Sequence, residues 1–186
     1  GPSIATPLNN LAMIYASQGR HDEAEQLYIR SIKIHEKELG SDHPEVALKL
    51  NNIAELYRAK GRYKEAQSNH RRALGIREQV LGPDHPDTAI SLNNLAMVET
   101  IVGRHKEARN AFQRALSIHE KALGPDSPVV AVIINNLGSL SQATGSYKEA
   151  EELFGRSLRI NEKALGRNHP TVATNLNNLA DLYMRQ

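Results

Sequence analysis

Residues 44–85, PEVALKLNNIAELYRAKGRYKEAQSNHRRALGIREQVLGPDH, decide the fold because their pattern returns every 42 residues along the chain. The pair Asn51-Asn52 recurs at this step without insertion, and so do Gly61 and Ala66. A fixed period of this length is the signature of a solenoid of stacked units. We therefore expect residues 1–186 to form one domain of about four and a half repeats. The expected repeats span about 2–43, 44–85, 86–127, 128–169 and 170–186.

Each repeat predicts two antiparallel helices. Pro44 suits the first turn of a helix, where its missing N–H costs nothing. The apolar residues from Ala47 to Tyr57 then fall on one face at helical spacing, and Gly61 ends this helix. First helices are expected at about 3–18, 44–60, 86–102, 128–144 and 170–186, and second helices at about 21–39, 63–81, 105–123 and 147–165.

The expected fold is all-α, a right-handed superhelical solenoid of antiparallel helix hairpins. A single hairpin cannot bury its own apolar faces, so stability comes from stacking on neighbours. Small residues such as Ala12 and Ala24 should let the two helices of a hairpin approach within ~8–10 Å. The seams between repeats should be filled by Leu8, Leu50, Leu92, Ile134 and Leu176.

Composition excludes several classes of protein. The net charge is only +2, which gives no field for nucleic acid or an anionic membrane. No apolar run approaches the ~18 residues of a membrane span. The chain has no cysteine, so it has no disulfide and no thiolate site, and this suits a cytoplasmic location. Its start, Gly1-Pro2-Ser3, reads as the remnant of a cleaved tag on a fragment of a longer protein.

The Asn-Asn pairs need a functional explanation, because Asn is a mediocre helix former. First helices line the concave wall of such a superhelix, so the second Asn of each pair would form a row along a groove. Helices lie ~10 Å apart and an extended chain advances ~3.3 Å per residue, so this row could meet a bound peptide about every three residues. The expected row is Asn10, Asn52, Asn94, Asn136 and Asn178, with Glu55 and Met97 on the same flank.

The pairs also have a structural interpretation, in which the amides tie adjacent helices together. We expect the first Asn of each pair to do this. These residues are Asn9, Asn51, Asn93 and Asn135. The interpretation in which both members of each pair are purely structural stays open on the sequence alone.

The repeated residues resemble a known family. Ile53, Ala54, Tyr57, Gly61 and Ala66 fit the pattern Leu-Ala-x-x-Tyr-x-x-x-Gly-x-Tyr-x-x-Ala, which resembles the tetratricopeptide repeat of ~34 residues. The 42-residue unit, with Leu-Asn-Asn-Leu-Ala and Leu-Gly-Pro-Asp-His-Pro, resembles the cargo-binding domain of kinesin light chains. Nephrocystin-3-like proteins and bacterial repeat proteins are similar.

The resemblance implies that the second Asn of each pair lies in a cargo groove beside basic residues that meet acidic cargo. Arg77 matches a groove arginine of kinesin light chains, and Arg58 matches another basic position. His35 and His119 match the Arg77 position in part, and Asn161 departs from it, so the basic lining is thinner than in kinesin light chains, whose groove selects a tryptophan-plus-acidic motif. Arg58 and Arg77 can also be interpreted as ordinary solvated helix charges.

Metal, catalytic and RNA-binding sites are not expected. His43, His85 and His169 recur on the order of 10 Å apart, whereas zinc ligands sit ~2 Å from one ion, so these residues should instead help to start the next helix. No Gly-rich phosphate loop or nucleophile elbow occurs, so we expect no enzyme and no cofactor. The inner wall lacks the aromatic residues that stack on RNA bases.

These observations together predict a cytoplasmic scaffold that binds a linear peptide segment of a protein partner. The alternative is a structural or regulatory module of a larger protein. The final helix, near 170–186, lacks a second helix, so its bare apolar face could support end-to-end self-association.

Overall fold

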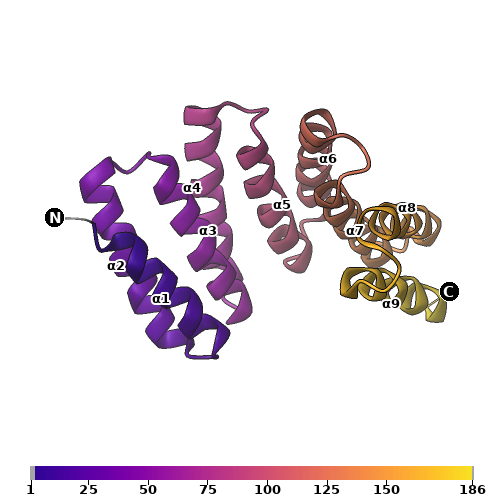
Figure 1. Ribbon diagram of the computed structural model, residues 1–186, viewed down its shortest axis with the longest axis horizontal. Coiled ribbons are helices and arrows are strands. Elements are labelled where there is room, and N and C mark those ends of the chain that lie inside the picture. Colours follow the sequence, from indigo (N-terminus) through magenta and orange to yellow (C-terminus); the bar gives the residue numbers. More distant parts are fainter. Residues whose placement is uncertain (1–2, 186) are drawn as a thin grey trace. The chain divides into compact units, whose positions relative to one another are not determined.

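The computed structural model describes residues 3–185, and their backbone forms helices and no strand. The helices are α1 (Ala5–Ser17), α2 (His21–Leu39), α3 (Pro44–Ala59), α4 (Tyr63–Leu81), α5 (Pro86–Ile101), α6 (His105–Leu123), α7 (Pro128–Ala143), α8 (Tyr147–Leu165) and α9 (Pro170–Met184). The two helices of a hairpin, such as α1 and α2, α3 and α4, or α7 and α8, run antiparallel (Figure 1). The predicted all-α fold of stacked helix hairpins is confirmed.

The predicted helix bounds agree closely with the structure. The four second helices begin and end at the predicted residues, whereas α1, α3, α5 and α7 end one residue earlier than expected and α1 begins two residues later. Gly61 and Gly82, which follow α3 and α4, have φ of 71° and 96°, a conformation that glycine adopts without strain. The predicted end of the last helix at residue 186 lies outside the described residues.

The residue before each repeated proline caps the following helix. His43 Nδ1 accepts a hydrogen bond from the Glu45 backbone N–H at 3.2 Å, and His169 does the same for Thr171. Ser127 takes this position in the fourth repeat and accepts from the Val129 N–H at 3.3 Å. Side-chain acceptors at this position satisfy a backbone donor that the helix cannot pair. The histidines therefore start helices, as predicted.

The chain divides into two compact units, Gly1–Val98 and Glu99–Gln186, here called unit 1 and unit 2. In unit 1, α1 packs on α2 and α3 packs on both α2 and α4. In unit 2, α7 packs on α6 and α8, and α9 packs on α8. The prediction that the whole chain is a single domain stays a prediction.

Small residues let the helices of each hairpin approach closely. Ala12, Ala24, Ala54 and Ala66 are fully buried. The clearest case is Gly138 of α7, where a Cβ atom would lie 2.7 Å from the Phe154 ring of α8. The Phe154 ring therefore leaves room only for glycine at this point of the α7–α8 contact.

The predicted seam residues are buried where both neighbouring repeats are present. Leu50, Leu92 and Ile134 are buried, as expected, whereas Leu8 is half-buried. The prediction for Leu176 is wrong, because half of this side chain is exposed. No second helix covers α9 within residues 3–185, so the seam that Leu176 would fill is open.

Candidate functional site

The first Asn of a pair links neighbouring helices at Asn9, Asn51 and Asn135. Asn51 is buried, donates to Ser91 Oγ at 3.1 Å, and accepts from His70 Nδ1 at 2.8 Å. Asn135 Oδ1 accepts from both Asn175 and Asn178 of α9. The structural interpretation of the first Asn is therefore confirmed at these positions.

The second Asn of each pair lies at the surface with one side of its amide engaged. Asn52 is half-buried, and its Nδ2 donates to Asn9 Oδ1 of the preceding repeat at 3.1 Å. Asn10 is exposed, and Asn94 Oδ1 accepts from its neighbour Asn93 at 3.2 Å. Asn136 is half-buried as well. These amides are accessible to a ligand, and contact with one stays a prediction.

A recess of about 310 Å³ opens beside the Asn51-Asn52 pair in unit 1. We call it the unit-1 recess; it is lined by Leu48, Asn51, Asn52, Arg77, Asp87 and Ile90, with Glu45 and Asn94 at its margin. Leu48 and Ile90 occupy the same repeat position, one on α3 and one on α5, and each is about 40% exposed. The recess thus combines amides with two accessible apolar side chains.

Arg77 lines this recess but is only 5% exposed, so the interpretation as a solvated helix charge is wrong for it. Its Nη1 donates to the Asp87 backbone carbonyl at 2.8 Å and to Ser91 Oγ at 3.0 Å. Burial lowers the pKa of the Arg77 guanidinium, and the nearby Asp87 carboxylate opposes this shift. Arg77 therefore holds α4 against the start of α5, and most of its surface is taken up by protein.

Arg58 and Glu55 form an ion pair on the flank of α3, with Arg58 Nη2 2.7 Å from Glu55 Oε2. The other Glu55 oxygen faces Nε2 of the fully buried His70 at 3.3 Å. Burial raises the pKa of the Glu55 carboxyl, but His70 and Arg58 lower it by more. Both predicted ligand-binding residues are thus engaged with protein, although each keeps about a third of its side chain exposed.

A second recess of about 280 Å³ occupies the equivalent place in unit 2. This unit-2 recess is lined by Val132, Asn135, Asn161, Thr171, Thr174 and Asn175. Asn161 stands where unit 1 has Arg77, and its Nδ2 donates to Asn175 Oδ1 at 2.7 Å. Thr171 and Thr174 stand where unit 1 has Asp87 and Ile90. The recess is therefore a feature of the repeat, and its chemistry differs between the units.

Sequence reasoning missed Leu48 and Ile90 as candidate binding residues. A signal was present, because Leu48, Ile90 and Val132 form a column of large apolar residues at the 42-residue step. All three are exposed beside the Asn pairs. Met97, which was predicted on this flank, is half-buried, and its sulfur atom lies 3.8 Å from Asn93 Nδ2.

Comparison with protein-family models gives tetratricopeptide repeat matches at residues 45–121, 91–161 and 129–186, and a further one at 5–45. The chain belongs to the tetratricopeptide repeat family. This confirms the resemblance expected from the repeated residues. No curated protein matches the sequence.

Solved structures with the same fold are found among other proteins. BtubC (BKLC) from P. vanneervenii is 26% identical with a TM-score of 0.83, over 95% of this chain and 70% of that one. A putative kinesin light chain from Podosopora anserina, with nearly identical repeats, is 28% identical with a TM-score of 0.82, over 99% and 87%. A Rap protein solved with Competence and Sporulation Factor shares the fold at 21% identity and a TM-score of 0.79, over 96% of this chain and 47% of that one.

The tetratricopeptide repeat architecture supports a scaffold for protein interactions. Along residues 3–185, every helix is too short or too polar to cross a membrane. The same residues hold no group of three or more side chains placed to ligate a metal ion. The surface of interest is therefore the repeated recess beside the Asn pairs.

Proposed function

We propose that the chain is a peptide-binding scaffold whose principal site is the unit-1 recess. The observation that carries this proposal is the recurrence of a recess where exposed apolar residues meet the amides of the Asn pairs. A hollow of ~300 Å³ is at the small end of ligand sites, which suits one apolar side chain of a segment that continues beyond it.

The lining suggests what each part of the peptide would contact. An apolar side chain would pack between Leu48 and Ile90, and the accessible sides of Asn52 and Asn94 would pair with the peptide backbone. Asn10 would extend the same kind of contact at the equivalent position of the preceding repeat. The apolar residue of the peptide would therefore determine most of the specificity of binding.

Charge in the unit-1 recess favours a basic neighbour in the peptide. The Arg77 guanidinium is buried and hydrogen-bonded, whereas Asp87 is half-exposed and forms no ion pair among residues 3–185. A lysine or arginine of the peptide could pair with Asp87 at the rim. Contact of Arg77 or Arg58 with acidic residues, which the kinesin light chain resemblance implies, is the competing outcome.

The test uses labelled ten-residue peptides that carry one large apolar residue flanked by Lys, Gln or Glu, with fluorescence anisotropy as the readout. Leu48→Ala with Ile90→Ala should weaken binding at least ~10-fold, because each removed side chain contributes roughly 1 kcal/mol of apolar contact. Val132→Ala, at the same position in unit 2, is the matched control and should leave the affinity unchanged. Asn52→Ala with Asn94→Ala should weaken binding while far-UV circular dichroism stays unchanged.

Two outcomes separate the alternatives. Unchanged binding in both double variants would exclude the unit-1 recess as the site. If Glu-flanked peptides bind best and Asp87→Asn strengthens their binding, the arginines select acidic ligands and the basic preference is wrong.

A structural module that self-associates is the second candidate function. The observation that favours it is the exposed apolar surface of α9, where Tyr183 is 55% and Leu176 50% exposed. Sedimentation velocity over a concentration series tests it. A sedimentation coefficient that rises with concentration, and no longer does so in Leu176→Ser, would support self-association through α9. A monomer at every concentration would exclude it.

A further inference from the structure

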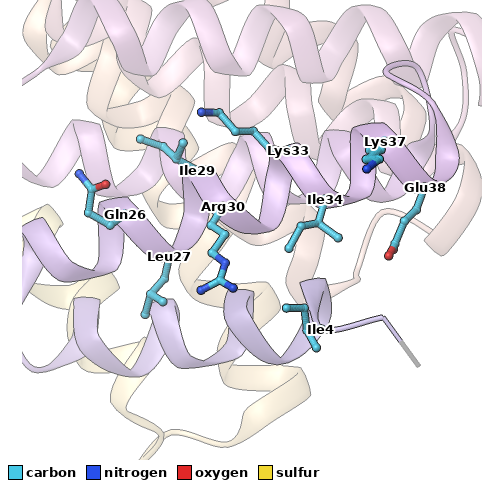
Figure 2. A pocket seen from close by; sticks show the side chains of 9 residues that line it. All are labelled: Ile4, Gln26, Leu27, Ile29, Arg30, Lys33, Ile34, Lys37 and Glu38. Carbon is cyan, nitrogen blue, oxygen red and sulfur yellow. The ribbon is translucent and has the colours of Figure 1, made fainter. Parts of the chain in front are cut away.

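The hollow that opens on α2 lies at the N-terminal end of unit 1. It measures about 950 Å³. We call this surface the end face and define it by Ile4, Leu27, Arg30, Lys33, Ile34 and Lys37. Figure 2 shows Leu27, Arg30 and Ile34 projecting from α2 toward α1, with Ile34 beside Ile4 at the start of α1. The face thus combines apolar side chains with three cations, and Glu38 also lines the hollow.

The repeat shows what normally covers this face. Arg72 and Arg156 stand at the repeat position of Arg30, and each forms an ion pair with a glutamate of the preceding repeat. Arg72 lies 2.7 Å from Glu36 in unit 1, and Arg156 lies 2.6 Å from Glu120 in unit 2. Within unit 1 and within unit 2, a repeat therefore presents a cationic leading edge to the acidic trailing edge of the repeat before it.

A second pair of columns has the same polarity. Lys163, at the repeat position of Lys37, lies 2.6 Å from Asp126 in the loop that ends the preceding repeat. Asp42 and Asp84 occupy the position of Asp126 in other repeats. At the end face, by contrast, Arg30 and Lys37 form no ion pair with any of residues 3–185. Arg30 and Lys37 thus lack the acidic partners that their counterparts in other repeats have.

The apolar residues of the end face are likewise more exposed than their counterparts in later repeats. Ile76 and Ile160, at the position of Ile34, are 4% and 5% exposed. Ile34 itself is only half-buried and lines the open hollow, and half of Ile4 is exposed. Apolar residues of this kind are stabilised by a neighbour that removes them from water.

We propose that the end face is a stacking surface for a further helical hairpin of the same 42-residue type, placed ahead of residue 2 in register. Its second helix presents a glutamate to Arg30, and the loop that follows presents an aspartate to Lys37. The charge polarity selects a trailing edge, because a second leading edge would bring arginine against arginine.

A second copy of this chain is a poorer occupant. Its trailing-edge residue, Glu162, lies on α8, and α9 already packs against α8. The first repeat of another copy would have to displace α9 to place Arg30 against Glu162. A hairpin that ends with its own second helix meets no such obstacle.

The experiment adds one repeat to the chain. Residues 44–85 are fused directly before residue 2, which keeps the 42-residue step and places Glu78 and Asp84 of the added copy opposite Arg30 and Lys37. The fusion should unfold in one transition at a higher urea midpoint than the parent and with a larger m value, which grows with the surface exposed. An added repeat that unfolds separately, with the parent midpoint unchanged, would overturn the proposal.

Charge reversal tests the specific contact. In the fusion, Arg30→Glu should lower the urea midpoint, and Glu78→Arg in the added copy should restore it. In the parent chain, Arg30→Glu should leave the midpoint unchanged, because Arg30 has no partner there. An equal loss in the parent and the fusion would mean that Arg30 acts within its own hairpin, and the stacking contact would be rejected.

Thiol labelling gives a readout independent of stability, because the chain has no cysteine of its own. Ile34→Cys should react quickly in the parent and at least ~10-fold more slowly in the fusion, where the added repeat covers it. Ile76→Cys is the control and should react slowly in both. Equal labelling of Ile34→Cys in both proteins would contradict coverage of the end face. Concentration-dependent protection in the parent would instead assign the face to a second copy.

Discussion

Unit 1 and unit 2 build the same recess from different side chains. In unit 1, Arg77 from α4 bonds to the start of α5, and Asp87 and Ile90 lie beside it. In unit 2, Asn161 from α8 bonds to Asn175 of α9, beside Thr171 and Thr174. The repeat therefore fixes where a recess forms, and the residues at three or four variable positions decide what it could bind.

The tie between consecutive repeats should be stronger in unit 1 than in unit 2. Arg77→Ala removes two hydrogen bonds from a buried cation and should cost about 3 kcal/mol of unfolding free energy. Asn161→Ala removes one neutral hydrogen bond and should cost about 1–2 kcal/mol. Urea denaturation followed by circular dichroism measures both. Equal losses of unfolding free energy would mean that the buried Arg77 stabilises the contact between repeats no more than the neutral Asn161 does.

The hairpin contact also differs between the units. Phe154 of unit 2 faces Gly138, whereas unit 1 has His70 and Ala54 at these repeat positions. Gly138→Ala should cost about 2 kcal/mol, because the added methyl group would sit 2.7 Å from the Phe154 ring. Shortening the opposing side chain with Phe154→Leu should remove most of that penalty. A full penalty in the double variant would show that the cost arises in the α7 backbone.

A smaller contrast separates Glu25 from Glu151, which share one repeat position. Glu25 is largely buried and pairs with Lys60 at 2.7 Å and Arg62 at 2.8 Å, whereas Glu151 accepts from Tyr183. At pH 7, Glu25→Gln should cost about 1 kcal/mol and Glu151→Gln less than about 0.5 kcal/mol.

The Glu25 contribution should depend on pH in one direction. Burial raises the pKa of Glu25, but the hydrogen bonds from Lys60 and Arg62 lower it by more, so the folded-state pKa lies below the ordinary 4.5. The stabilisation is then fully present above pH 4.5 and is lost as the pH falls through the folded-state pKa. Unfolding curves of wild type and Glu25→Gln should converge toward pH 3. A constant gap between them would assign the effect to packing.

Most of the fold could be predicted because the residues that set it act locally. Gly61 and Gly82 end helices through their own backbone freedom, and His43 caps a helix two residues away. The site was harder to predict. Arg77 looks like a solvated charge in sequence, and its burial depends on how α4 meets α5.

The cluster of His70, Asn51 and Glu55 was not predicted for the same reason. These residues come from two helices, and only the packing of α3 on α4 brings them together. The exposure of Leu48 and Ile90 likewise depends on how the first helices cross, although their repeated spacing was visible.

Side-chain amide signals in nuclear magnetic resonance test the central claim most directly, because Asn groups mark both recesses. Titration with the tightest apolar–basic peptide should shift the Nδ2 signals of Asn52 and Asn94 in unit 1. The signals of Asn135 and Asn175 in unit 2 should stay in place at the same peptide concentration. Shifts confined to unit 2, or no shift of any Asn amide under saturating peptide, would contradict the account.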